Sequence, residues 1–172
     1  LIADLEFYHW LQDRIEQIND RDLQTLVEMI ERSCQNKANV VSRDEREADI
    51  RAILNLGHTF GHAMETAELY KGLLHGEAVA VGMLMAAEMS CRLNWIARAE
   101  VDDLREFLVA VGLPVDVPGV MTAENFMAAM TLDKKVSDGV VRLVLRNAVG
   151  NAVLSGDYPG QILAEVLCDF CR

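Results

Sequence analysis

Basic residues are scarce in this sequence. Lys and Arg total 16 against 27 Asp and Glu, which gives a formal net charge of -11. Such a chain repels nucleic acid and anionic membranes unless a local basic patch overrides the field. The sequence contains no basic tract with interleaved aromatic residues. We therefore expect neither a nucleic-acid partner nor a membrane partner.

Long apolar runs are also missing. The longest run, "AVAVGMLMAA" at 78–87, is too short to cross a bilayer. The opening "LIADLEFYHW" lacks the basic start of a secretion signal. These features predict a soluble, cytoplasmic protein.

Aromatic residues make up only 6% of the chain, and Ala, Leu, Met and Val carry most of the apolar content. This composition favours packed helices over a β-sandwich. Cysteine is limited to four positions. Cys168 and Cys171 form a single CxxC at the end of an amphipathic pattern, which favours helix-end thiols over a redox or zinc motif. Cys34 and Cys91 are expected to be packing residues in a reducing compartment.

Hydrophobic periodicity predicts one mainly α, multi-helical domain over residues 1–172 with one small β-hairpin. The hairpin is expected around Asn147 to Asn151, where β-branched residues alternate. The expected helices cover 3–18, about 22 to the forties, 50–70, 76–93, 98–112, 122–135 and 159–171.

A narrow polar stripe interrupts the apolar text "RAILNLGHTFGHAMET" at 51–66. On one continuous helix, Arg51, Asn55, His58 and His62 lie within a sector of roughly 60°. Gly57 and Gly61 flank the two histidines and permit close approach by a neighbouring element or a ligand. The pattern predicts that the stripe faces a buried polar pocket.

Two histidines four residues apart on a helix can present imidazole nitrogens to one metal ion. From spacing alone, the candidate ligands are His58, His62 and His75, with Glu65 or Glu77 as a possible carboxylate. Spacing does not decide which histidines bind the metal. The competing interpretation is that the histidines are structural.

Several motifs together resemble the 3-dehydroquinate synthase family of sugar-phosphate cyclases: "KANVVSRDERE", "LNLGHTFGHAMETA", "LLHGEAVAVGM" and "LDKKVSDGVVRLVL". The matching part of that family is its C-terminal, mostly helical domain. The resemblance implies conversion of 3-deoxy-arabino-heptulosonate 7-phosphate to 3-dehydroquinate and phosphate, in the shikimate pathway to chorismate and aromatic amino acids. It also implies zinc or cobalt, NAD as a recycled oxidant, and a homodimer.

The same resemblance implies roles for single residues. His58 and His75 correspond to metal ligands, and His62 to a group that assists proton transfer beside the substrate. Lys37 and Arg51 correspond to cations that hold the substrate carboxylate. Glu47 corresponds to an active-site carboxylate of the family. Asn55 and one lysine, Lys135 or Lys134, correspond to contacts on the phosphate side of the substrate.

Other parts of the family pattern are not in this sequence. The segment "YKGLLHG" departs slightly from the family's YGxxLHG. The third metal ligand, a catalytic lysine and the NAD-binding domain are expected outside these residues, and the chain alone is expected to be inactive. The alternatives are another sugar-phosphate cyclase, whose substrate lacks a carboxylate, and a non-catalytic helical module. Lys37 and Arg51 argue against the first alternative.

Overall fold

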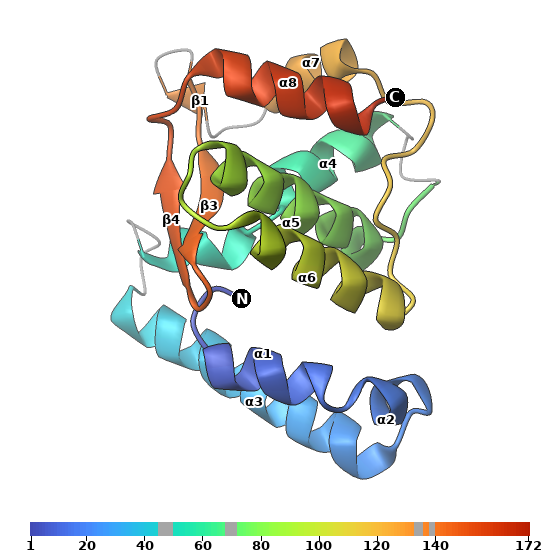
Figure 1. Ribbon diagram of the computed structural model, residues 1–172. Coiled ribbons are helices and arrows are strands. Elements are labelled where there is room, and N and C mark those ends of the chain that lie inside the picture. Colours follow the sequence, from blue (N-terminus) through green and yellow to red (C-terminus); the bar gives the residue numbers. More distant parts are fainter. Residues whose placement is uncertain (45–49, 68–71, 133–135, 138–139) are drawn as a thin grey trace.

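The computed structural model describes residues 1–44, 50–67, 72–132, 136–137 and 140–172 (Figure 1). The described part of the chain is mainly helical, as the sequence predicts. None of its helices is long and apolar enough to cross a membrane. The helices are α1 (Leu5–Gln12), α2 (Ile15–Asn19), α3 (Leu23–Arg43), the 3-10 helix η1 (Ile50–Asn55), α4 (His58–Ala67), α5 (His75–Arg92), α6 (Arg98–Ala110), α7 (Ala123–Leu132) and α8 (Gly160–Phe170). The strands are β1 (Val136–Ser137), β2 (Val140–Val141), β3 (Leu143–Ala148) and β4 (Asn151–Ser155).

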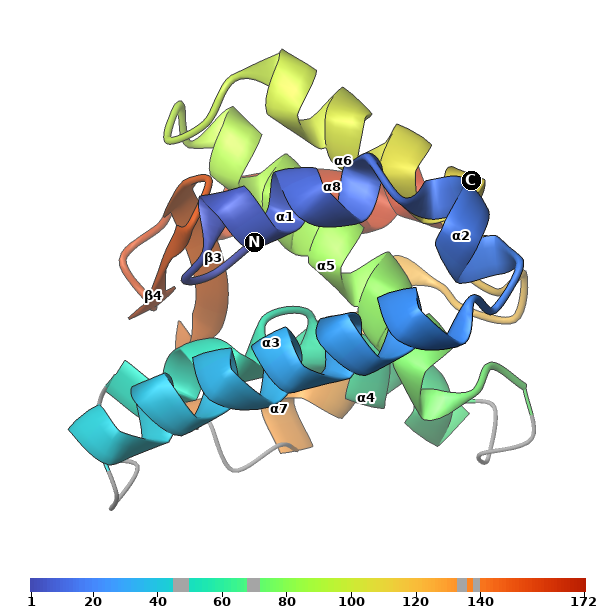
Figure 2. The same cartoon turned by 90° about the horizontal axis from the view of Figure 1, so that it is seen from below.

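Helix α5 is the centre of the molecule. It packs against α4, α6, α8 and β3, and most of its side chains from Ala78 to Ser90 are buried. Helices α1 to α3 lie together below this body in Figure 1, and Figure 2 views the same layer from below. The apolar run at 78–87 is therefore a central core helix.

The predicted β-hairpin is confirmed. Strands β3 and β4 pair antiparallel, from Leu143 opposite Ser155 to Ala148 opposite Asn151. Gly150 supplies the positive φ, of +80°, in the connecting turn. A second antiparallel ladder of two residues joins β1 to β2.

Two predicted helices are divided in the structure. The helix expected over 3–18 becomes α1 and α2, because the Arg14 amide turns back to the Leu11 carbonyl at 3.2 Å and tightens the end of α1. The helix expected over 50–70 becomes η1 and α4. Gly57 separates them with a φ of +81°, which a helix cannot contain. The prediction of one continuous polar helix face was therefore wrong.

Glycines set the close crossing of α4 and α5. A Cβ added to Gly82 would collide with the Gly57 carbonyl oxygen, and a Cβ on Gly57 would come within 2.6 Å of the Met83 amide nitrogen. A Cβ on Gly61 would lie 3.2 Å from the Ala78 carbonyl oxygen. The prediction that Gly57 and Gly61 admit a neighbouring element is confirmed, and the neighbour is α5.

The apolar residues along one side of α3 are exposed. Leu23, Val27 and Ile30 are 75%, 56% and 57% exposed, and Cys34 is exposed with them. Helix α3 uses a different face, carrying the buried Thr25 and Val40, towards the rest of the described chain. The packing role predicted for Cys34 is therefore wrong.

Arg146 of β3 is a buried cation that sequence patterns did not indicate. Its side chain is 1% exposed, and its Nη2 donates to Glu100 Oε2 of α6 at 3.1 Å. Its backbone amide donates to Ser90 Oγ of α5 at 3.1 Å. Burial lowers the pKa of this guanidinium. Arg146 thus ties the hairpin to both α5 and α6.

Glu88 of α5 is a second buried charge, 8% exposed, and it accepts from Arg98 Nη2 at 2.9 Å and from Arg92 Nε at 2.8 Å. The hydrogen bond from Arg98, aided by the one from Arg92, holds the pKa of Glu88 below its ordinary value of 4.5, although burial opposes the shift.

Because the folded-state pKa of Glu88 is lowered, its stabilising contribution is present above pH 4.5 and is lost as the pH falls below that value. We expect Glu88→Gln to flatten the acid limb of the unfolding free energy in urea titrations over this range. Glu106→Gln, at an exposed position of α6, is the control and is expected to keep the wild-type slope. An unchanged slope in the Glu88 variant would contradict this prediction.

Candidate active site

Three histidine side chains meet where α4 and α5 begin. His58 is the first residue of α4, His62 follows one turn later, and His75 is the first residue of α5. The ring centroids are 5.5 Å apart for His58 and His62, 5.4 Å for His58 and His75, and 5.8 Å for His62 and His75. The turn at Gly57 and the packing of α4 on α5 therefore bring the three histidines together.

Two of the rings have their Nδ1 atom engaged. His58 Nδ1 lies 3.3 Å from the Leu56 carbonyl oxygen, and His75 Nδ1 lies 3.0 Å from Glu65 Oε1. A carbonyl or carboxylate oxygen accepts, so each Nδ1 is the donor. The Nε2 atom of both rings then carries the lone pair that a metal ion requires.

His62 differs from the other two. Within the part of the chain that the structure describes, its ring makes no hydrogen bond, and the residue is exposed. Its backbone carbonyl accepts from the Thr66 hydroxyl at 2.8 Å, a bond that does not involve the ring, and the ring itself contacts those of His58 and His75. Both nitrogens of this ring are therefore available to exchange a proton.

The two candidate carboxylates have different surroundings. Glu65 is 8% exposed, and one ligand atom from each of His62, Glu65 and His75 lies within 4.8 Å of the other two. Glu77 accepts from the Leu74 amide at 2.7 Å and caps the start of α5. Imidazole nitrogens beside a carboxylate suit zinc or a similar divalent ion. The residues present fit such an ion.

The other predicted site residues lie on α3 and η1, which pack together. Lys37 is exposed on α3. Arg51 and Asn55 belong to η1 and are half-buried, and the Arg51 amide donates to Asp44 Oδ2 at 3.1 Å. Glu47, Lys134 and Lys135 lie outside the described residues.

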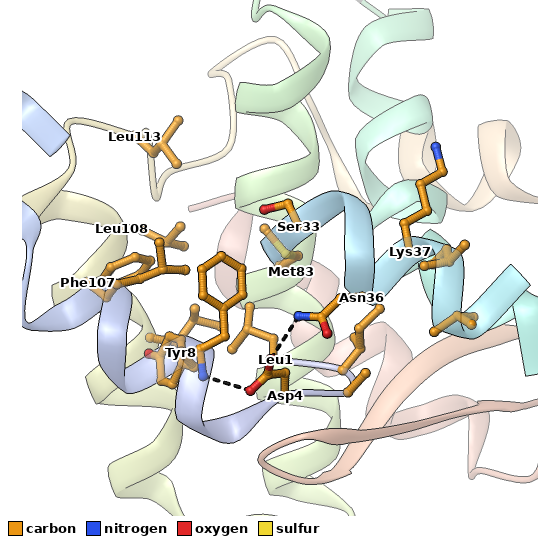
Figure 3. Close-up of a pocket in the computed structure, with 17 residues that line it drawn as sticks. Leu1, Asp4, Tyr8, Ser33, Asn36, Lys37, Met83, Phe107, Leu108 and Leu113 are labelled. Atoms are coloured by element: carbon orange, nitrogen blue, oxygen red, sulfur yellow. Dashed lines mark hydrogen bonds between the residues drawn. The ribbon is translucent and has the colours of Figure 1, made fainter. Parts of the chain in front are cut away.

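A separate cavity of about 340 Å³ lies between the α1–α3 layer and helices α5 and α6. Most of its wall is apolar, and Figure 3 shows the Lys37 ammonium pointing away from the lining residues Tyr8, Phe107 and Leu108. Asp4 spans one side by accepting from Asn36 Nδ2 at 3.0 Å. The lining comes from five separate segments of the chain, so no local pattern in the sequence could indicate it. Its apolar wall does not suit a phosphorylated sugar.

Comparison with known proteins shows which family the chain resembles. Residues 1–136 match the family described as "3-dehydroquinate synthase C-terminal". The 3-dehydroquinate synthase of Saccharophagus degradans is 48% identical over 167 residues, covering 97% of this chain and 46% of that protein. The chain spans about half the length of the curated relatives it matches.

Solved structures of related cyclases share the fold. The 2-epi-5-epi-valiolone synthase of Streptomyces hygroscopicus subsp. jinggangensis, with NAD⁺ and Zn²⁺ bound, superposes with a TM-score of 0.84 at 25% identity, over 97% of this chain and 46% of that one. A 2-deoxy-scyllo-inosose synthase complexed with carbaglucose-6-phosphate, NAD⁺ and Co²⁺ gives a TM-score of 0.70 at 28% identity, over 79% and 40%. The family match and the 48% identity together show that this chain belongs to the 3-dehydroquinate synthase family.

Proposed function

We propose that this chain provides the metal- and substrate-binding helical domain, residues 1–172, of a 3-dehydroquinate synthase. The whole enzyme would be a lyase that converts 3-deoxy-arabino-heptulosonate 7-phosphate to 3-dehydroquinate and phosphate. The observation that carries the proposal is the three-histidine cluster, in which two rings have Nδ1 engaged and the third does not. The names of the relatives support the choice of reaction.

His58 and His75 are the proposed metal ligands of this chain. The oxygen opposite each Nδ1 keeps the proton on that nitrogen. Each Nε2 then has a lone pair that can bind a metal ion, and no change of tautomer is needed. A bound Zn²⁺ or Co²⁺ would supply Lewis acidity towards the reacting oxygens of the substrate. Two imidazoles leave positions for a further protein ligand and for substrate.

His62 is the proposed proton-transfer residue. Its ring lies 5.5 Å from that of His58 and 5.8 Å from that of His75, centroid to centroid, so it is adjacent to the proposed ligands. With neither ring nitrogen bonded within the described residues, the imidazole can accept a proton at one nitrogen and release it from the other.

The anionic ends of the substrate require cations and amide donors. We assign Lys37 and Arg51 to the carboxylate, and their placement on the packed pair α3 and η1 supports this. Asn55, four residues after Arg51 on η1, is assigned to the phosphate side. The roles proposed for Glu47 and for Lys135 or Lys134 rest on the family resemblance alone.

We place the NAD site mainly on residues outside this chain. The relatives are about twice as long as the matched region, and both solved cyclases hold NAD⁺. A homodimer of the whole enzyme remains part of the proposal, by family resemblance.

The test uses the full polypeptide that carries this sequence, with NAD and zinc, and measures phosphate release from the heptulosonate phosphate. Sugar phosphates without a carboxylate form the comparison panel. They are the strongest alternative substrates, because a related cyclase structure holds carbaglucose-6-phosphate. We expect turnover of the carboxylate-bearing substrate only. Preference for a substrate without a carboxylate would assign the protein to another cyclase activity, and no turnover at all would favour a non-catalytic module.

Arg51→Lys gives a sharper test of substrate choice, because Lys keeps the charge but loses the planar fork that pairs with a carboxylate. We expect kcat/KM to fall by about tenfold or more, most of it in KM. Arg43→Lys, the same change at an exposed position of α3, is the matched control. Equal kinetics in the Arg51 variant and the wild type would remove Arg51 from the substrate site.

A further inference from the structure

We propose that Glu65 is a positioning residue that fixes the ring and the tautomer of His75 for metal binding; the inference deepens, and rests on, the function proposed for this site. Glu65 belongs to α4 and His75 begins α5, so their contact crosses the junction between the two helices. Glu65 Oε1 lies 3.0 Å from His75 Nδ1.

Burial distinguishes the two partners. The Glu65 side chain is 8% exposed, whereas that of His75 is 58% exposed. A buried carboxylate requires a hydrogen-bond donor, and the Nδ1–H of His75 is its partner across the helix junction. The more exposed ring of His75 also contacts the His58 and His62 rings, but those ring contacts do not select a tautomer. The buried partner therefore sets the orientation of the exposed one.

The chemical consequence concerns one nitrogen. A carboxylate accepts and does not donate, so it keeps the proton on Nδ1 and leaves the lone pair on Nε2. His58 obtains the same arrangement from the Leu56 carbonyl oxygen, at 3.3 Å. No side-chain substitution removes a backbone carbonyl, so of these two contacts only the one made by Glu65 can be deleted by mutation.

One competing role for Glu65 follows from the same geometry. Single ligand atoms of His62, Glu65 and His75 lie within 4.8 Å of one another, so Glu65 could bind a metal directly. The two roles respond differently to Gln. The Gln carbonyl still accepts from Nδ1–H, but a neutral amide is a poor substitute for a carboxylate ligand of zinc.

The experiment compares Glu65→Gln, Glu65→Leu and the control Glu106→Gln, at an exposed position of α6, in the full polypeptide. Nitrogen-15 NMR of metal-free protein reports the His75 tautomer, and chelator competition reports the dissociation constant for Zn²⁺. We expect an Nδ1–H tautomer in the wild type and in Glu65→Gln, and its loss in Glu65→Leu. We expect zinc binding to weaken about 10- to 100-fold in Glu65→Leu and to stay within about threefold of the wild type in the two Gln variants.

Each opposing result overturns the inference. Equal weakening in Glu65→Gln and Glu65→Leu would make Glu65 a direct ligand, and unchanged binding in Glu65→Leu would leave it without a role. An Nε2–H tautomer of His75 in the wild type would overturn the inference even if the Leu variant does not fold. The tautomer and the zinc constant do not depend on turnover, so failure of the proposed reaction would be seen separately.

Discussion

Gly82→Ala is expected to destabilise the protein by about 3 kcal/mol, although Ala is the better helix former. Gly82 lies inside α5, where helix propensity alone predicts a gain of about 1 kcal/mol. The added methyl group would meet the Gly57 carbonyl oxygen of the turn before α4. Backbone cannot move aside as a flexible side chain can, so α4 and α5 must separate. Urea unfolding of the full polypeptide measures the loss.

Gly76→Ala is the matched control on the same helix. Nothing lies within 4 Å of a Cβ built at Gly76, so we expect a change in stability smaller than about 1 kcal/mol. Hydrogen exchange of the α4 and α5 amides should rise in the Gly82 variant only. Equal stability of the two variants would show that the helices tolerate a wider crossing.

The second large effect concerns the different roles proposed for the histidines, which are metal binding for His58 and His75 and proton transfer for His62. We expect His58→Ala and His75→Ala to weaken zinc binding by more than about 100-fold, because removal of a ligand exceeds loss of a group that only orients one. We expect His62→Ala to retain zinc and to lower kcat by about 10²- to 10⁴-fold, the range for a proton-transfer group. Metal content after dialysis and steady-state kinetics separate the two outcomes.

His9→Ala is the control, because His9 is an exposed histidine of α1. Its zinc content and kcat are expected to match those of the wild type. The Co²⁺ form adds a spectroscopic measurement, since its visible absorption depends on the ligands. A spectrum changed by His62→Ala in the same way as by His75→Ala would place His62 on the metal and contradict the proposed split.

Much of the fold follows from local sequence. Period-3.6 patterns located α5, α6 and α8, and β-branched alternation located the β3–β4 hairpin. Local patterns did not locate the break at Gly57. In the sequence, Gly57 and Gly61 look alike, yet Gly57 has a φ of +81° and Gly61 is helical, although both lie against α5.

The exposed apolar side chains of α3 are a second feature that local sequence did not indicate. Leu23, Val27 and Ile30 have the spacing of a core-facing helix, yet all three are more than half exposed. Periodicity identifies an apolar face but does not identify what it packs against. Arg146 makes the same point for charge. Its residue type predicts exposure, but its side chain on β3 is buried and donates to Glu100 of α6.

The sequence by itself determined the helical class, the hairpin and the identity of the three histidines, because each depends on local spacing and residue type. Only the tertiary structure decided how those histidines differ. The Leu56 carbonyl is held at the His58 ring by the turn before α4, and Glu65 reaches His75 because α4 and α5 cross closely at their glycines. A ring nitrogen becomes a donor or a ligand according to what lies opposite it, and that is a property of packing.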